Sequence, residues 1–221
     1  MDNPKRNLAS GSIPKSAPKS PASEATPQAL ATGAFDIVAL AASAGGLTAV
    51  SQVLGQLPDN FPAAIAIVQH LDPTHRSFMA DILGRKTALS VKQAEAGEQV
   101  QAGTVYIAPP NYHLLVNPDK TLALTQTERV HFLRPSADLL FESVAVAYQD
   151  HAIAVVLTGT GNDGAVGVQA IHQNGGKVIA QDEETSDFFG MPGSAVETGA
   201  VDFVLPLSEI AAALMRLVFQ G

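Results

Sequence analysis

From residue 35 onward, short and almost wholly apolar runs alternate with segments in which apolar residues recur every three or four positions. The apolar runs are typical of strands covered on both faces, and the intervening pattern is typical of helices with one buried face. Their alternation predicts an α/β class fold: a doubly wound parallel sheet with helices on both faces. The expected strands are 35–41, 63–70, 152–158, 177–181 and 202–206, and the expected helices are 46–57, 75–85, 136–149, 165–176 and 208–218.

Residues 90–126 have a different pattern. Their apolar runs are short and alternating, and they are interrupted by Gly, Pro and the turn-forming stretch 117–120. Such runs are typical of antiparallel hairpins. We therefore expect a small antiparallel hairpin insertion at one end of the sheet.

The first 34 residues are rich in Pro, Ser and Ala and hold almost no large apolar side chain. A segment of this kind cannot bury enough surface to offset the entropy lost on ordering. The sequence therefore predicts two parts: a flexible tail or linker over 1–34 and a folded domain over 35–221.

Composition excludes several classes of protein. A formal net charge of −8 argues against a nucleic-acid or anionic-membrane surface. The absence of cysteine rules out disulfides and thiolate metal sites. No apolar run is long enough to span a bilayer, and the N-terminus lacks the apolar core of a secretory signal. We expect no membrane insertion and a cytoplasmic location.

Three chemically capable residues follow three of the expected strands. Ser43 ends the run DIVALAAS and is followed by Ala44, Gly45 and Gly46; His70 ends the second strand; Asp163 lies in the loop LTGTGNDG after the third. The carboxyl ends of parallel strands share one edge of the sheet, so these side chains are expected to lie together. Serine, histidine and aspartate are the three parts of an acyl-transfer site.

Each of these residues also has a structural interpretation. Ser43 is well placed to cap the following helix, and Asp163 is of the type that forms glycine-rich turns. His70 is of the type that ends an apolar strand with no catalytic role, and His113 stays open as an alternative base. The coincidence of all three candidates at one sheet edge favours the catalytic interpretation.

The loop Gly159-Thr160-Gly161-Asn162-Asp163-Gly164 supports a second hypothesis. It matches the pattern G-x-G-x-x-G between a strand and a helix, and Asp182 follows after the next strand. This is the local context of a dinucleotide-binding module. Two features oppose it: Asp163 would repel a pyrophosphate, and the unit comes late in the chain.

The chain from about Phe35 to Val218 resembles the catalytic domain of the chemotaxis protein-glutamate methylesterases. The resemblance is carried by ASAGG around Ser43, VQHLDPTHRSFMADIL around His70 and VVLTGTGNDGAVG around Asp163. It extends through GTVYIAPPNYHLLV, FLRPSADLLFESVA and AQDEETSDFFGMPGSAVETGAVDFVLPLSEIA in the same order.

The resemblance implies hydrolysis of glutamate γ-methyl esters on the cytoplasmic helices of chemoreceptors, with release of methanol, and in some members deamidation of receptor glutamine. It makes Ser43 the nucleophile, His70 the general base and Asp163 the orienting carboxylate. Backbone N–H groups of Ala44 and Thr160 are the candidate oxyanion donors. No metal or organic cofactor is expected.

Arg134 is a candidate contact for the substrate helix, and its alternative role is that of a surface salt-bridge partner. Relatives usually carry an N-terminal receiver domain, whereas a 34-residue polar stretch precedes this domain. We therefore expect no phosphorylation control in cis and leave a regulator in trans open. Where relatives commonly have Pro-Arg-Glu-Ala, this chain has Pro-Gly-Ser-Ala at 192–195.

Overall fold

The computed structural model describes residues 1–2, 35–70 and 78–219. The tail prediction for 1–34 therefore lies almost wholly outside the described residues, as does the start of the helix expected at 75–85. No helix in the described ranges is both long enough and apolar enough to cross a membrane.

Within the described residues, seven parallel strands form the main sheet, in the order β3-β4-β2-β1-β7-β8-β9, and two further strands, β5 and β6, pair antiparallel. The strands are β1 Ile37–Ala42, β2 Ala64–Gln69, β3 Ser90–Gln93, β4 Thr104–Ile107, β5 His113–Val116, β6 Leu122–Thr125, β7 Ala152–Val156, β8 Lys177–Gln181 and β9 Phe203–Leu205. The predicted fold class is confirmed.

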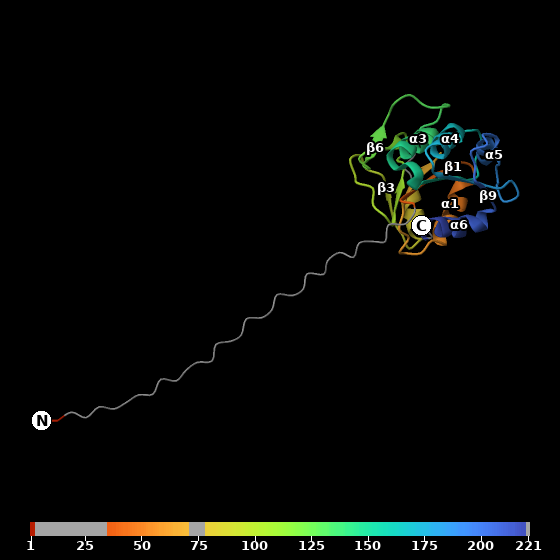
Figure 1. Ribbon diagram of the computed structural model, residues 1–221. Helices are drawn as coiled ribbons and strands as arrows, with labels where there is room; N and C mark the ends of the chain where they lie inside the picture. The colour runs from red at the N-terminus through yellow and green to blue at the C-terminus, as the bar shows by residue number, and fades with distance from the viewer. Residues whose placement is uncertain (3–34, 71–77, 220–221) are drawn as a thin grey trace.

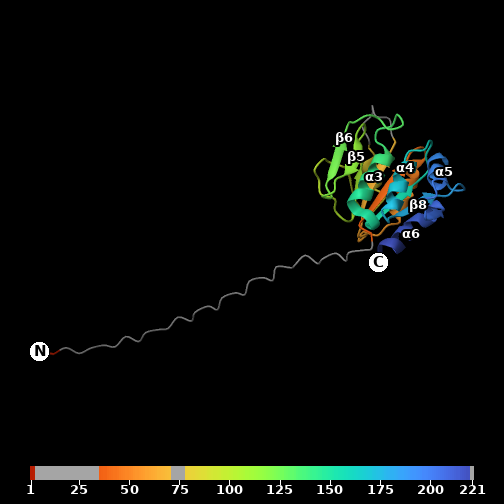
Figure 2. The ribbon, with the colours of Figure 1, turned by 45° about the horizontal axis from the view of Figure 1, so that its top comes forward.

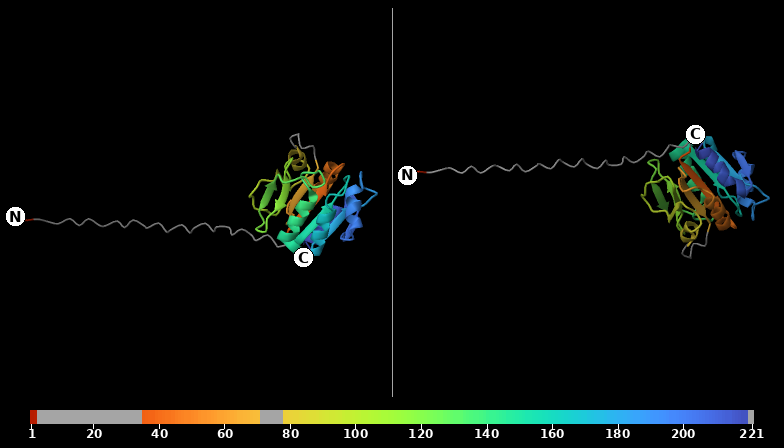
Figure 3. Two further views of the ribbon diagram at one scale, coloured as in Figure 1. Left: turned by 90° about the horizontal axis from the view of Figure 1, so that it is seen from above. Right: turned by 90° about the horizontal axis from the view of Figure 1, so that it is seen from below.

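Helices cover both faces of the sheet, as Figure 1 shows, with α3, α4 and α5 on one side and α1 and α6 on the other. The helices are α1 Gly46–Gly55, α2 Met79–Gly84, α3 Ala137–Tyr148, α4 Ala165–Gln173, α5 Gly190–Glu197 and α6 Leu207–Phe219, with a short 3₁₀ turn at Gln149–His151. Figure 3 gives the two opposite views, with α6 and α1 on the face seen from below.

The central strand β1 explains why the sheet needs both layers. All six of its residues are buried, and alternate side chains enter two separate cores. Ile37, Ala39 and Ala41 pack toward α3 and α4, whereas Val38, Leu40 and Ala42 pack toward α1 and α6. A strand that is apolar at every position is therefore the signature of a sheet covered twice.

The region 90–126 differs from the sequence-based expectation. Strands β3 and β4 pair parallel with each other and extend the main sheet beyond β2, so the prediction of antiparallel hairpins is wrong for them. Only β5 and β6 form the expected hairpin, which packs beside α3 (Figure 2). The reason is packing: Val105 and Ile107 on β4 are buried against the α1 and α6 side of the core.

Two features of the helices also differ. The sequence patterns do not predict helix α5, and α6 begins at Leu207, one residue before the expected start. Helix α5 forms although it holds two glycines and Pro192, because Met191 and Ala195 are buried in the core. Tertiary packing here overrides weak helix propensity.

Candidate active site

The carboxyl end of β1 leads into a tight turn that carries Ser43. The Ser43 N–H donates to the Thr158 carbonyl (3.0 Å), and the Ser43 carbonyl accepts from the Gly46 N–H (2.9 Å). Gly45 has φ 78° and is the N-cap of α1. The Ser43 side chain therefore does not cap the helix, and the capping interpretation is wrong.

An open pocket of about 420 Å³ lies at this turn. It holds both Ser43 and His70 in its wall, so the two sequence candidates face one cavity. The full lining is Ser43, Ala44, Gly45, Gly46, Leu47, Thr48, Gln69 and His70. Because the N-terminus of α1 forms one wall, its unbonded N–H groups give the pocket a positive potential.

His70 and Asp163 are directly bonded. His70 Nε2 lies 2.8 Å from Asp163 Oδ2, with the histidine side chain 9 % exposed and the aspartate side chain fully buried. The structure thus brings the second and third sequence candidates into contact. Within the described residues no hydrogen bond joins the Ser43 hydroxyl to His70, and such bonds often tighten only when substrate binds.

The Asp163 carboxylate is saturated with donors. Besides His70 it accepts from the Ser136 hydroxyl (2.8 Å) and from the N–H groups of Ala137 (2.6 Å) and Asp138 (3.2 Å). Burial by itself raises the pKa of Asp163, but the bond from His70 and those from the α3 backbone outweigh it and hold the pKa below its ordinary value. The lowered pKa favours the charged form of the carboxylate, which is the form that stabilises a protonated His70.

Gly159 packs against the nucleophile. A Cβ placed on it would lie 2.8 Å from the Ser43 Cβ and would also collide with Met191 Sδ. The Met191 N–H donates to the Gly159 carbonyl (2.8 Å), which holds α5 at this position. The first glycine of the loop thus serves close packing behind Ser43.

Buried polar side chains gather at this edge of the sheet. Among the described residues the buried polar or charged side chains are Gln69, His113, Ser136, Asp138, Thr158, Asp163 and Gln181. Two examples show their function: the Gln69 amide donates to the Ser43 carbonyl (2.7 Å), and the Thr158 hydroxyl donates to the Ala44 carbonyl (3.0 Å). These two hydrogen bonds hold the backbone of the turn at Ser43 and Ala44 in place.

The candidate oxyanion donors are free to act. In the described part of the chain, neither the Ala44 N–H nor the Thr160 N–H donates to a protein acceptor. Thr160 is exposed and Ala44 lines the pocket. Their assignment stays a prediction.

Arg134 and His113 have structural partners. The Arg134 guanidinium donates to Asn111 Oδ1 and to the carbonyls of Gln126 and Thr127, so it ties two loops together. Its role as a substrate contact stays a prediction, and its donors are largely used within the protein. His113 is buried; its Nδ1 accepts from the Ser136 N–H and its Nε2 donates to the Glu128 carbonyl.

The structure argues against the dinucleotide hypothesis. The N–H groups of Gly164, Val166 and Gly167, at the start of α4, already donate to Asp138 Oδ1. A pyrophosphate would need these same donors. Asp182, the candidate ribose ligand, instead accepts from the N–H and hydroxyl of Thr185.

The described part of the chain also holds no cluster of three or more His, Asp or Glu side chains that is suited to a metal ion.

The comparisons with known proteins concern nearly the whole folded domain. The family model described as CheB methylesterase matches residues 38–214.

A putative protein-glutamate methylesterase/protein-glutamine glutaminase of Leptospira interrogans is 42 % identical over 183 residues, which are 83 % of this chain and 95 % of that protein. The protein-glutamate methylesterase FrzG of Myxococcus xanthus is 46 % identical over 83 % of this chain, but the match spans only 55 % of that protein. The crystal structure of the Thermotoga maritima CheB methylesterase catalytic domain superposes with a TM-score of 0.80 at 40 % identity, over 83 % of this chain and 99 % of that one.

Proposed function

Because the chain belongs to the CheB methylesterase family, we propose that it hydrolyses glutamate γ-methyl esters on the cytoplasmic helices of chemoreceptor-type proteins and releases methanol. The names of several relatives also include protein-glutamine glutaminase. We extend the proposal to deamidation of glutamine, in which the same site releases ammonia.

The observation that carries the proposal is the placement of Ser43 and His70 in one pocket, with Asp163 bonded to His70 behind it. A serine hydroxyl becomes a nucleophile when a neighbouring base takes its proton, and a buried carboxylate orients that base and stabilises its charged form. Ser43, His70 and Asp163 are our nucleophile, base and orienting carboxylate.

The reaction begins when the Ser43 hydroxyl oxygen attacks the ester carbonyl carbon and its proton passes to His70. In the observed ring orientation Nε2 faces Asp163, so Nδ1 is the nitrogen left for that proton. The carbonyl oxygen becomes an oxyanion, for which the N–H groups of Ala44 and Thr160 are the proposed donors.

Collapse of this intermediate breaks the bond between carbonyl carbon and methoxy oxygen, and His70 returns the proton to the departing methanol. Water then attacks the acyl-Ser43 ester with His70 again as base. The products are a glutamate carboxylate and the free serine.

The pocket is open to a protein segment. It borders a second hollow of about 410 Å³ between α1 and α2, and the two share Leu47 and Thr48 in their walls. This shape supports a macromolecular substrate, whose modified side chain enters the pocket while its backbone stays outside. The open pocket also supports basal activity without a domain movement. We further propose that another protein can regulate this activity in trans.

The test is methanol release from methylated receptor, with ammonia release from an unmodified glutamine form measured alongside. Ser43→Ala should lower turnover by at least about 1,000-fold. Ser208→Ala, on the exposed side of α6, is the matched control and should leave turnover unchanged. Near-normal methanol release by the folded Ser43→Ala protein would rule out the serine mechanism.

The regulator is tested separately. Basal turnover of the isolated chain should be measurable without any phosphodonor. Inactivity that is relieved only by a phosphorylated partner protein would show that activation is obligatory and comes from another chain.

A further inference from the structure

Two aspartates beside the site each accept hydrogen bonds from the N-terminus of a helix to which they do not belong. Asp163 precedes α4 but accepts from the first N–H groups of α3, those of Ala137 and Asp138. Asp138 lies in the first turn of α3 but accepts from the start of α4. Its Oδ1 atom bonds the N–H groups at 164, 166 and 167, at 2.9, 3.0 and 2.9 Å.

Each carboxylate therefore supplies acceptor oxygens to the N-terminus of the helix that begins beside the other aspartate. The first N–H groups of a helix have no partner within it, and a buried one left unbonded is costly. Here the first N–H groups of α3 are bonded by Asp163, in the loop before α4, and those of α4 are bonded by Asp138, in the first turn of α3. These reciprocal hydrogen bonds fix the start of α3 and the start of α4 relative to one another.

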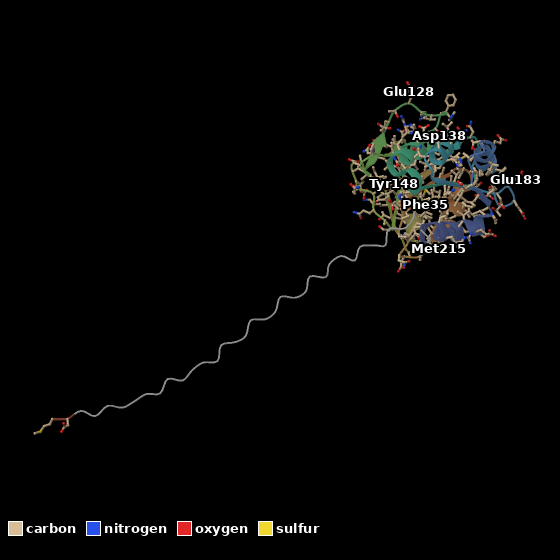
Figure 4. All side chains as sticks on the ribbon, in the orientation of Figure 1. Phe35, Glu128, Asp138, Tyr148, Glu183 and Met215 are labelled. Carbon is tan, nitrogen blue, oxygen red and sulfur yellow. The ribbon has the colours of Figure 1, made fainter. Side chains whose placement is uncertain are left out.

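Close packing makes this arrangement rigid. A Cβ on Gly167 would lie 2.6 Å from the Phe141 Cβ and 3.0 Å from the Asp138 backbone, so no side chain fits between the helices there. Asp138 is itself 4 % exposed and lies in the layer that holds α3 and α4 (Figure 4). It lines none of the pocket at Ser43.

We propose that Asp138 is a positioning residue for the ester hydrolysis: by bonding the start of α4 it fixes the backbone that follows Asp163, and so fixes the carboxylate against His70. It acts through Asp163 and touches no substrate. This inference rests on the proposed function for its kinetic test, but its structural test does not require the receptor.

The role requires an acceptor oxygen and not a second charge. All three backbone bonds go to Oδ1, whereas Oδ2 lies 3.8 Å from His131 Nε2 on the exposed side. Burial, reinforced by the nearby Asp163 charge, raises the pKa of Asp138 above its ordinary value. An asparagine keeps an oxygen at this position, and it is therefore the conservative replacement.

The kinetic experiment compares Asp138→Ala, Asp138→Asn and Asp202→Ala. Asp202 is the matched control, because it also accepts a backbone N–H, that of Val178, and pairs with Lys177. It lies at the amino ends of β8 and β9, away from the strand ends that carry the site. We expect Asp138→Ala to lower kcat by about 100-fold, with KM changed by less than about threefold, as for a displacement of about 1 Å at the chemistry. Asp138→Asn should recover at least about a tenth of wild-type kcat, and Asp202→Ala should keep it.

The structural experiment uses the proton on His70 Nε2, which NMR detects as a downfield resonance when it is hydrogen-bonded to Asp163. This signal should broaden or move upfield in Asp138→Ala and remain in Asp138→Asn and Asp202→Ala. Labelling of Ser43 by a fluorophosphonate should slow in Asp138→Ala and should be kept in Asp138→Asn and Asp202→Ala. Both readouts are independent of the receptor, so they separate failure of this inference from failure of the proposed substrate.

Wild-type kcat in folded Asp138→Ala, or an unchanged His70 resonance, would overturn the proposal. Equal losses in Asp138→Ala and Asp202→Ala would also overturn it, since they would mean that the effect comes from general destabilisation. If Asp138→Ala does not fold, the asparagine variant decides, because it must then keep both the resonance and the labelling rate.

Discussion

A single methyl group at Gly159 tests whether the loop after β7 holds the nucleophile in place. An alanine Cβ there would lie 2.8 Å from the Ser43 Cβ and would also collide with Met191 Sδ. Ordinary carbon contacts are about 3.5–4.0 Å. The backbone of the loop or Ser43 must therefore move by about 0.7–1.2 Å, the shortfall from ordinary contact. Met191 must move as well, because its sulfur would be closer still to the new Cβ.

The size of the effect follows from that displacement. Overpacking a well-packed site costs about 1–3 kcal/mol of unfolding free energy. Misplacing a catalytic group by about 1 Å costs about 100-fold in rate. Because the Gly159 carbonyl also accepts from the Met191 N–H, the protein cannot relieve the collision by rotating the loop without losing this bond. We expect Gly159→Ala to fold with reduced stability and to lose about 100-fold in kcat.

The assay is methanol release together with urea unfolding, and Gly84→Ala is the matched control. A Cβ at Gly84 would meet the Val91 Cβ at an ordinary 3.8 Å, so this variant should keep its activity and gain up to about 1 kcal/mol in the helix. Normal turnover in stably folded Gly159→Ala would refute the argument that this glycine sets the position of Ser43.

Further outcomes are expected at the site and behind it. Asp163→Asn should lower unfolding free energy by about 2–4 kcal/mol, because its new NH₂ must face a backbone N–H, and turnover by about 10⁴-fold; urea titration and the methanol assay measure both. The double variant Ser43→Ala/His70→Ala should be no slower than the worse single variant, since the residues act as one unit. Burial lowers the pKa of His113, so the stability that this histidine contributes is complete above pH about 6.5 and declines as the pH falls below it; pH-dependent unfolding of His113→Gln should show a weaker decline between about pH 6.5 and 5. Calorimetric titration with NAD or ATP should give no binding heat, and micromolar binding would revive the dinucleotide hypothesis.

The sheet and the placement of the three candidates follow from local patterns. Strands such as Ile37–Ala42 and Ala152–Val156 are apolar throughout, which predicts a parallel sheet, and parallel strands end at a common edge. These patterns are therefore sufficient to predict that Ser43, His70 and Asp163 lie together. The direction of β3 could not, because an alternating pattern marks a half-exposed strand in either orientation.

Other features depend on contacts between distant residues. Nothing in the sequence around Asp138 distinguishes a side chain that bonds another helix from one that bonds its own, and the donors to Asp163 lie well upstream of it. Arg134 illustrates the same limit: its chemistry suits a carbonyl on a substrate or on the protein, and the structure supplies protein carbonyls from Gln126 and Thr127. Helix α5 forms because Met191 is buried in the core, a contact with residues distant in the sequence.

The strand order has a consequence for how the protein acquires activity. Strand β1 lies between β2, its near neighbour in the chain, and β7, which comes from the second half of the domain. Pairings between distant segments form late in folding, because a long loop must close before they bring any gain. During synthesis, Ser43 and His70 are made together, whereas Asp163 arrives only with the turn after β7. Full hydrolysis is therefore expected only in molecules in which β7 has paired with β1, and the return of esterase activity during refolding reports the closure of this central strand pair.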